Sequence, residues 1–111
     1  MKTLDLKKEL KAYYQPSAKK PAILQVPRFQ FAMIDGTIEK GSEPGLSPEF
    51  AEATQALYGI AYTLKFALKK RKQDPIDYPV MALEGLWGVT DGHFDITVKD
   101  NWSYTLMILQ P

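Results

Sequence analysis

A single acidic residue interrupts an apolar stretch in the second half of the chain. The stretch, PVMALEGLWG, runs from residue 79 to 88 and contains Glu84. Removing a carboxylate from water costs several kcal/mol unless a partner compensates for the loss. Two explanations stay open. Glu84 lines an apolar pocket, where it could pair with a cationic ligand or act as a general acid or base, or it is an edge residue that reaches solvent or bonds a tyrosine hydroxyl.

Four aromatic side chains are the further candidates for a binding site. Tyr58 and Tyr62 lie four positions apart in a helical pattern, so they share one helix face at the border of the core. Two phenols at the rim of a pocket with Glu84 would offer aromatic walls and hydrogen bonds to a ligand. Trp87 and Trp102 could serve as ligand platforms in the same way. The simpler alternative for the two tyrosines is a ring turned inward with its hydroxyl in water, and for the two tryptophans it is a place in the core.

Other kinds of chemistry find no support in the residues. The chain has no cysteine, and its one histidine, His93, has no second histidine nearby, so we expect no metal site. DGTIEKG matches neither the phosphate-binding loop nor the dinucleotide-binding spacing, so we expect no nucleotide cofactor. Ser103 and Thr105 have no base that the sequence can identify, which leaves a nucleophilic triad unsupported.

Length and charge limit the class of protein further. The 111 residues suffice for one domain with one core, and 14 basic against 13 acidic side chains give a net charge of +1. This balance does not predict direct nucleic-acid binding. No apolar run approaches the roughly 20 residues that cross a bilayer, and the start lacks the apolar core of a signal peptide. We therefore expect a soluble, cytoplasmic protein without a membrane partner.

The elements that would position Glu84 begin with a short helix and a strand. Leu6, Leu10, Tyr13 and Tyr14 have helical spacing, so residues 1–14 are predicted to form an amphipathic helix with Thr3 as its N-cap. A polar connection completes residues 1–20. Branched and aromatic residues then predict extended chain over 22–34, which Pro27 interrupts and the pair Asp35-Gly36 ends with a turn. Residues 37–46 are expected to be a flexible loop.

A long helix is predicted from Ser47 to the basic run at 69–72. Ser47 is the expected N-cap, Pro48 suits the first helical position, and Glu49 favours the positive end of the helix dipole. An apolar stripe follows at steps of three and four, formed by Phe50, Ala53, Leu57, Ile60, Ala61, Leu64 and Leu68.

Two more strands are expected after the helix, over 77–88 and 101–111, with a turn at 89–95 between them. Alternation along the first of them places Glu84 and Leu86 on one face and Gly85 and Trp87 on the other. The order of elements predicts an α+β fold, in which a βαββ module forms a mostly antiparallel sheet with one long helix on one face.

Four segments together resemble the GyrI-like small-molecule-binding family. They are KKPAILQVPRFQFAMIDG, SPEFAEATQALYGIAYTLKF, ALEGLWG and WSYTLMILQP, in this order. The resemblance implies that residues 21–111 form one βαββ module of an effector-binding type. Members usually carry this module twice, with a ligand groove where the two copies meet. Some free-standing members hydrolyse cyclopropane-bearing, DNA-alkylating natural products with a tyrosine and a glutamate.

The resemblance implies a ligand site formed by Glu84, Trp87, Tyr58 and Tyr62, and Trp102 is the fifth candidate for this site. The leading expectation is a multidrug-binding groove in which Glu84 anchors a bulky lipophilic or cationic small molecule. The alternatives are a hydrolase of electrophilic cyclopropane compounds, with Glu84 and Tyr62 as catalytic candidates, and an interaction module for a transcription regulator. Because one βαββ layer leaves apolar sheet surface uncovered, we also expect a homodimer in which a second copy replaces the second module.

Overall fold

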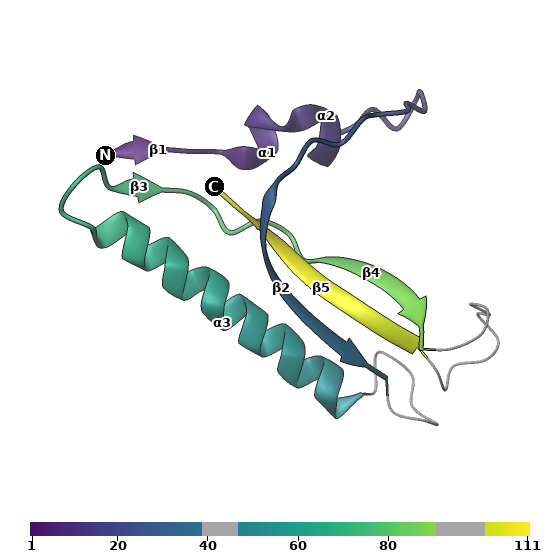
Figure 1. Cartoon of the computed structure of the whole chain (residues 1–111). Coiled ribbons are helices and arrows are strands. Elements are labelled where there is room, and N and C mark those ends of the chain that lie inside the picture. The colour runs from purple at the N-terminus through teal and green to yellow at the C-terminus, as the bar shows by residue number, and fades with distance from the viewer. Residues whose placement is uncertain (39–46, 91–101) are drawn as a thin grey trace.

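The computed structural model describes residues 1–38, 47–90 and 102–111. The predicted loop over 37–46 falls almost wholly outside these ranges, as do most of the turn at 89–95 and His93. The described residues form an α+β fold with one long helix and a three-stranded antiparallel sheet, which confirms the predicted class (Figure 1). No helix among them is long and apolar enough to span a bilayer.

The main sheet has the βαββ order that the pattern predicted. Its strands are β2 (Gln30–Thr37), β4 (Glu84–Val89) and β5 (Trp102–Gln110), with β5 in the centre and antiparallel to both neighbours. The first strand begins later than expected, at Gln30, and runs through Asp35 and Gly36, so the predicted turn at this pair is wrong.

Helix α3 (Pro48–Lys70) covers one face of the sheet. The Ser47 hydroxyl accepts a hydrogen bond from the Phe50 amide at 3.1 Å, as expected for the N-cap. The helix ends at Lys70, two residues before the end of the predicted basic run at 69–72, and Asp74 adopts a positive φ of 51° in the segment that follows.

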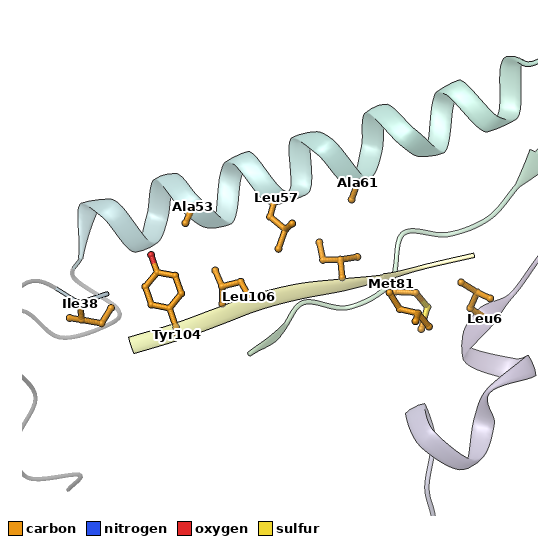
Figure 2. Close-up of a cluster of buried hydrophobic side chains, with 10 residues drawn as sticks. Leu6, Ile38, Ala53, Leu57, Ala61, Met81, Tyr104 and Leu106 are labelled. Carbon is orange, nitrogen blue, oxygen red and sulfur yellow. The ribbon is translucent and has the colours of Figure 1, made fainter. Parts of the chain in front are cut away.

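The core lies between α3 and the central strand β5. Ala53, Leu57 and Ala61 from the helix face Tyr104 and Leu106 from the strand (Figure 2). Burying side chains of this kind stabilises a fold by roughly 25 cal/mol for each Å² of apolar surface removed from water. Ile60 and Leu64 are exceptions to the predicted stripe, because they are 54% and 41% exposed.

The register separates the two faces of the sheet. Gly85, Trp87 and Val89 of β4 pair with Leu106, Tyr104 and Trp102, so these side chains share the face that α3 covers. Glu84 pairs with Met107, and Leu109 pairs with Phe31, on the opposite face. Ile108 and Leu109 are both buried although they are consecutive, which requires cover on both faces of the sheet at this point.

The cover on the second face comes from the N-terminal segment. It contains β1 (Lys2–Thr3), α1 (Leu6–Glu9) and α2 (Lys11–Tyr14), and Figure 1 shows α1 and α2 on the side of the sheet away from α3. The predicted single helix is therefore two short ones, and the N-cap of the first is Asp5 rather than Thr3. Leu6 is buried in the core cluster, and Leu10 and Tyr14 pack against it.

A second, small sheet ties the N-terminus to the segment after α3. Strand β1 pairs in parallel with β3 (Ile76–Asp77), and the Leu4 amide donates a hydrogen bond to the Asp77 carbonyl at 2.8 Å. The strand expected over 77–88 is thus divided between two sheets, since β4 begins only at Glu84. This pairing fixes the start of the N-terminal segment that covers the second face of the main sheet.

Candidate functional site

The Glu84 carboxylate lies at the start of an edge strand, on the face away from α3. It is half-buried, and its neighbour across the ladder is Met107 of β5. Leu86, two residues further along the same face, is 63% exposed. The carboxylate is therefore more enclosed than the apolar side chain beside it, which is the reverse of the usual preference of these residue types.

The partner that encloses Glu84 comes from the other end of the chain. The Tyr14 hydroxyl, at the end of α2, donates a hydrogen bond to Glu84 Oε2 at 2.7 Å. A hydrogen bond to an ionised acceptor is stronger than a neutral one, so the pair offsets part of the cost of removing the carboxylate from water. The structure combines the two alternatives for Glu84, because the carboxylate accepts a hydrogen bond from a tyrosine hydroxyl and also borders a cavity.

This contact holds Tyr14 in its protonated form. Burial raises the pKa of the Tyr14 phenol well above its ordinary value of 10.0, and the hydrogen bond to Glu84 and the charge of Glu84 raise it further. At neutral pH the phenol is therefore a hydrogen-bond donor and not a nucleophile. No other hydrogen bond to the Glu84 carboxylate is present within the described residues, so its second oxygen, Oε1, is placed to accept from a ligand.

A cavity of about 200 Å³ opens beside this pair, and we call it the Glu84 cavity. Its walls are four aromatic and two aliphatic side chains with Glu84 as the one charged group, namely Tyr13, Tyr14, Phe29, Phe31, Leu24 and Val26. Tyr13 meets Phe29 edge to face at 5.6 Å between ring centres, and Phe29 meets Phe31 at 6.4 Å. These contacts fix the orientation of the rings, which keeps the wall preformed.

Trp87 and Trp102 lie on the other face of the sheet, against α3. Together with Phe50 and Tyr104 they form what we call the helix-side aromatic cluster, in which ring centres are separated by 5.2 to 5.9 Å. The Tyr104 ring occupies the space above Gly36, where a Cβ atom would collide with its hydroxyl. Most of this cluster serves packing, although Trp87 remains 41% exposed.

The two predicted helix tyrosines do not meet Glu84 either. Tyr58 packs against the core cluster from α3, and Tyr62 is 47% exposed on the same helix. Because α3 and Glu84 lie on opposite faces of the sheet, the two tyrosines and the carboxylate do not line the same cavity. Of the five predicted ligand-binding residues, only Glu84 lines the Glu84 cavity. The binding roles of the other four stay predictions.

The residues that complete the cavity were present in the sequence pattern but had no assigned role. Phe29 and Phe31 are two positions apart before a strand, and Tyr13 and Tyr14 close the N-terminal helical pattern. The sequence pattern does not show that Tyr14 contacts Glu84, because the two residues are 70 positions apart and only the fold brings them together. Among the described residues, no group of three histidine, aspartate or glutamate side chains is arranged to hold a metal ion.

Comparison with known proteins finds similar structures but no matching family. No family model matches the sequence, and no curated protein matches it. An uncharacterized conserved protein from Listeria innocua is 36% identical, with a TM-score of 0.78 over 97% of this chain and 50% of its own.

Two solved structures described as hydrolases from Listeria innocua are similar in the same way. One is 36% identical, with a TM-score of 0.74 over 99% of this chain and 51% of its own. The other is 34% identical, with a TM-score of 0.70 over 97% of this chain and 49% of its own. The chain thus spans about half the length of the structures that it matches.

Proposed function

We propose that this chain is a GyrI-like small-molecule-binding module, and that the Glu84 cavity receives the aromatic, cationic part of a larger compound. The observation that carries the proposal is a half-buried carboxylate held by Tyr14 at the wall of a cavity lined by four aromatic rings. Aromatic faces and a carboxylate both attract a cation, and an apolar wall favours a lipophilic one.

The size of the cavity defines which part of a ligand fits. A cavity of about 150 Å³ holds benzene, so the 200 Å³ beside Glu84 accommodates one substituted ring. A bulky, planar compound would place one ring inside and leave the rest over the exposed side chains Leu86 and Met33 of the same sheet face. This arrangement would allow different compounds that share a cationic aromatic part to bind.

A pair of ligands that differ only in charge tests the proposal. Isothermal titration calorimetry would compare phenyltrimethylammonium with its neutral isostere tert-butylbenzene, in the wild type, in Glu84→Gln and in Glu52→Gln. The Glu84→Gln change keeps an acceptor for Tyr14 and removes only the charge, so we expect the cation to bind about tenfold more weakly and the neutral compound to bind as before. Glu52 is exposed on α3 and is the matched control. Unchanged affinity for the cation in Glu84→Gln would contradict the anchoring role.

Hydrolysis of an electrophilic compound is the second candidate, favoured by the Tyr14–Glu84 hydrogen bond and by the similarity to two proteins described as hydrolases. Glu84 would take one proton from a water molecule whose oxygen bonds to a strained cyclopropane carbon. The electron pair of the breaking carbon–carbon bond moves into a conjugated carbonyl, whose oxygen then gains a proton. The product contains one water more than the substrate. Tyr14, held protonated, keeps the carboxylate oriented by its hydrogen bond.

Mass spectrometry separates binding from turnover. A cyclopropane-bearing alkylator incubated with the chain should gain the mass of one water, and Glu84→Gln should abolish the gain. If the wild type binds the compound without producing the hydrated product, the catalytic candidate fails and the binding proposal stands.

The homodimer and the contact with a transcription regulator stay predictions. Light scattering at micromolar concentration checks the first, because a dimer has twice the 12.6 kDa mass of the chain. A pull-down that recovers a transcription factor would support the second.

A further inference from the structure

A second, larger cavity lies between α2 and the segment that leads to β2. Figure 1 shows this segment, residues 15–29, looping out beside α2 and returning to the sheet. The cavity has a volume of about 520 Å³. Its wall is mainly apolar, with Ala12, Pro16, Pro21 and Leu24 among the lining side chains, and the charged groups at its wall are Lys11 and Lys20. We call it the lysine cavity.

The lysine cavity and the Glu84 cavity have opposite charge. No acidic side chain lines the former, and no basic side chain lines the latter, among the described residues. The two cavities share one lining residue, Leu24, and otherwise have different walls. A cation that suits the Glu84 cavity is therefore repelled by the lysine cavity, and an anion is attracted to it.

The segment that forms the outer wall is held in place by proline and by local hydrogen bonds. Pro16 and Pro21 restrict the backbone, the Tyr13 hydroxyl donates to the Gln25 carbonyl at 3.3 Å, and the Lys19 amide donates to the Ser17 hydroxyl at 3.2 Å. A wall that is partly ordered before binding loses less conformational entropy when a ligand enters.

We propose that the lysine cavity is a second ligand site, which binds an amphiphilic anion with an apolar chain or ring and one carboxylate or sulfonate head. The apolar body lies against the alanine, leucine and proline side chains. The head group pairs with Lys11 and Lys20, whose flexible stems let the ammonium groups follow it. Two lysines around an apolar hollow suit a single anionic head better than a polyanion, which needs a broader basic surface.

Two decyl compounds of opposite charge test the proposal. Calorimetry would measure binding of sodium decanoate and of decyltrimethylammonium to the wild type, to Lys11→Glu/Lys20→Glu and to the control Lys70→Glu/Lys72→Glu. In Glu84→Gln, which lacks the anionic group of the first site, we expect decanoate to bind more tightly than the cation. We expect Lys11→Glu/Lys20→Glu to bind decanoate at least about tenfold more weakly than the wild type does. The control, with the same change in net charge at the end of α3, should bind decanoate like the wild type.

Two further measurements keep the result independent of folding and of the first site. Lys20→Glu alone lies outside any helix, so it should weaken decanoate binding without disturbing α2. Glu84→Gln should leave decanoate binding unchanged even if it abolishes binding of phenyltrimethylammonium. Equal binding of the two decyl compounds by Glu84→Gln, no binding of decanoate by the wild type, unchanged decanoate binding in Lys11→Glu/Lys20→Glu, or loss of decanoate binding in Glu84→Gln would each overturn the proposal.

Discussion

The sheet carries an aromatic group on each of its faces, and the two groups differ in charge and in cover. The helix-side aromatic cluster packs Phe50, Trp87, Trp102 and Tyr104 against one another under the start of α3, without a carboxylate among its members. The Glu84 cavity also has four aromatic rings, but they surround a hollow with a carboxylate at its wall. Rings that fill space stabilise the fold, whereas rings around a hollow leave room for a ligand.

The difference follows from how each face is covered. A continuous 23-residue helix covers the first face, with its small and apolar side chains set into the sheet. Two four-residue helices and a proline-containing segment cover the second, and their fit leaves open volume. We therefore expect substitutions on the helix side to change mainly stability, and substitutions around Glu84 to change mainly binding.

Leu57→Ala should produce the largest effect on stability. Leu57 lies on the buried side of α3 and is 1% exposed, so truncation leaves a cavity and should lower the free energy of unfolding by about 2–5 kcal/mol. Urea denaturation measures the change, and Ile60→Ala on the exposed side of the same helix is the control, with an expected loss of about 0.5 kcal/mol. Folded Leu57→Ala should still bind phenyltrimethylammonium. Equal losses in the two variants would show that the helix side is not the main core.

Tyr14→Phe should have a smaller effect on stability, with a clear dependence on pH. Loss of the hydrogen bond to Glu84 should lower the free energy of unfolding by about 1 kcal/mol at neutral pH. Because the pKa of Tyr14 is raised in the folded state, its contribution is present below the ordinary tyrosine value of 10.0 and is lost as the pH rises above it. The wild type should therefore lose more stability than Tyr14→Phe above about pH 10.

The exposed Tyr62 supplies the control for this pH dependence. Tyr62→Phe is the matched control, because it removes the hydroxyl of a side chain that is 47% exposed on α3, on the other face of the sheet from Glu84. Parallel alkaline profiles for the wild type and Tyr14→Phe would show that the contact with Glu84 does not hold the phenol protonated.

Asp77→Asn should have the smallest effect on the free energy of unfolding, and the effect should be limited to acidic pH. Lys65 Nζ lies 3.1 Å from Asp77 Oδ1 and lowers the pKa of this carboxyl below its ordinary value of 3.8, with a further contribution from Lys69. The contribution of the aspartate to stability is present above the ordinary value and is lost as the pH falls through the lowered one. Acid unfolding followed by circular dichroism should show less loss of stability below pH 4 in Asp77→Asn than in the wild type. Identical acid profiles would contradict this contact.

The helix and the central sheet could be predicted because their causes are local. Ser47 and Pro48 mark a helix start through their own backbone chemistry, and the buried positions Leu57 and Ala61 follow from helical spacing. The same local reasoning also included Ile60 in the apolar stripe of the helix, but this side chain is exposed because the sheet does not cover it.

The candidate site could be predicted only in part because its causes are not local. The apolar surroundings of Glu84 predicted a pocket or a tyrosine partner, and the structure has both. The tyrosine is Tyr14 because α2 lies over the face of the sheet away from α3. The sequence around residue 84 contains no pattern that indicates this position of α2. Strand alternation alone already placed Trp87 on the face opposite Glu84, and the register confirms this separation.

A titration followed by amide NMR tests the central claim most directly. Both tryptophans of the chain, Trp87 and Trp102, belong to the helix-side aromatic cluster, so their two indole signals report on that cluster alone. On addition of phenyltrimethylammonium, we predict the largest shifts at the amides of Tyr14, Phe31 and Glu84, and indole signals that stay in place. Indole signals that move first, with the Glu84 amide unchanged, would contradict the assignment of the ligand site to the Glu84 cavity.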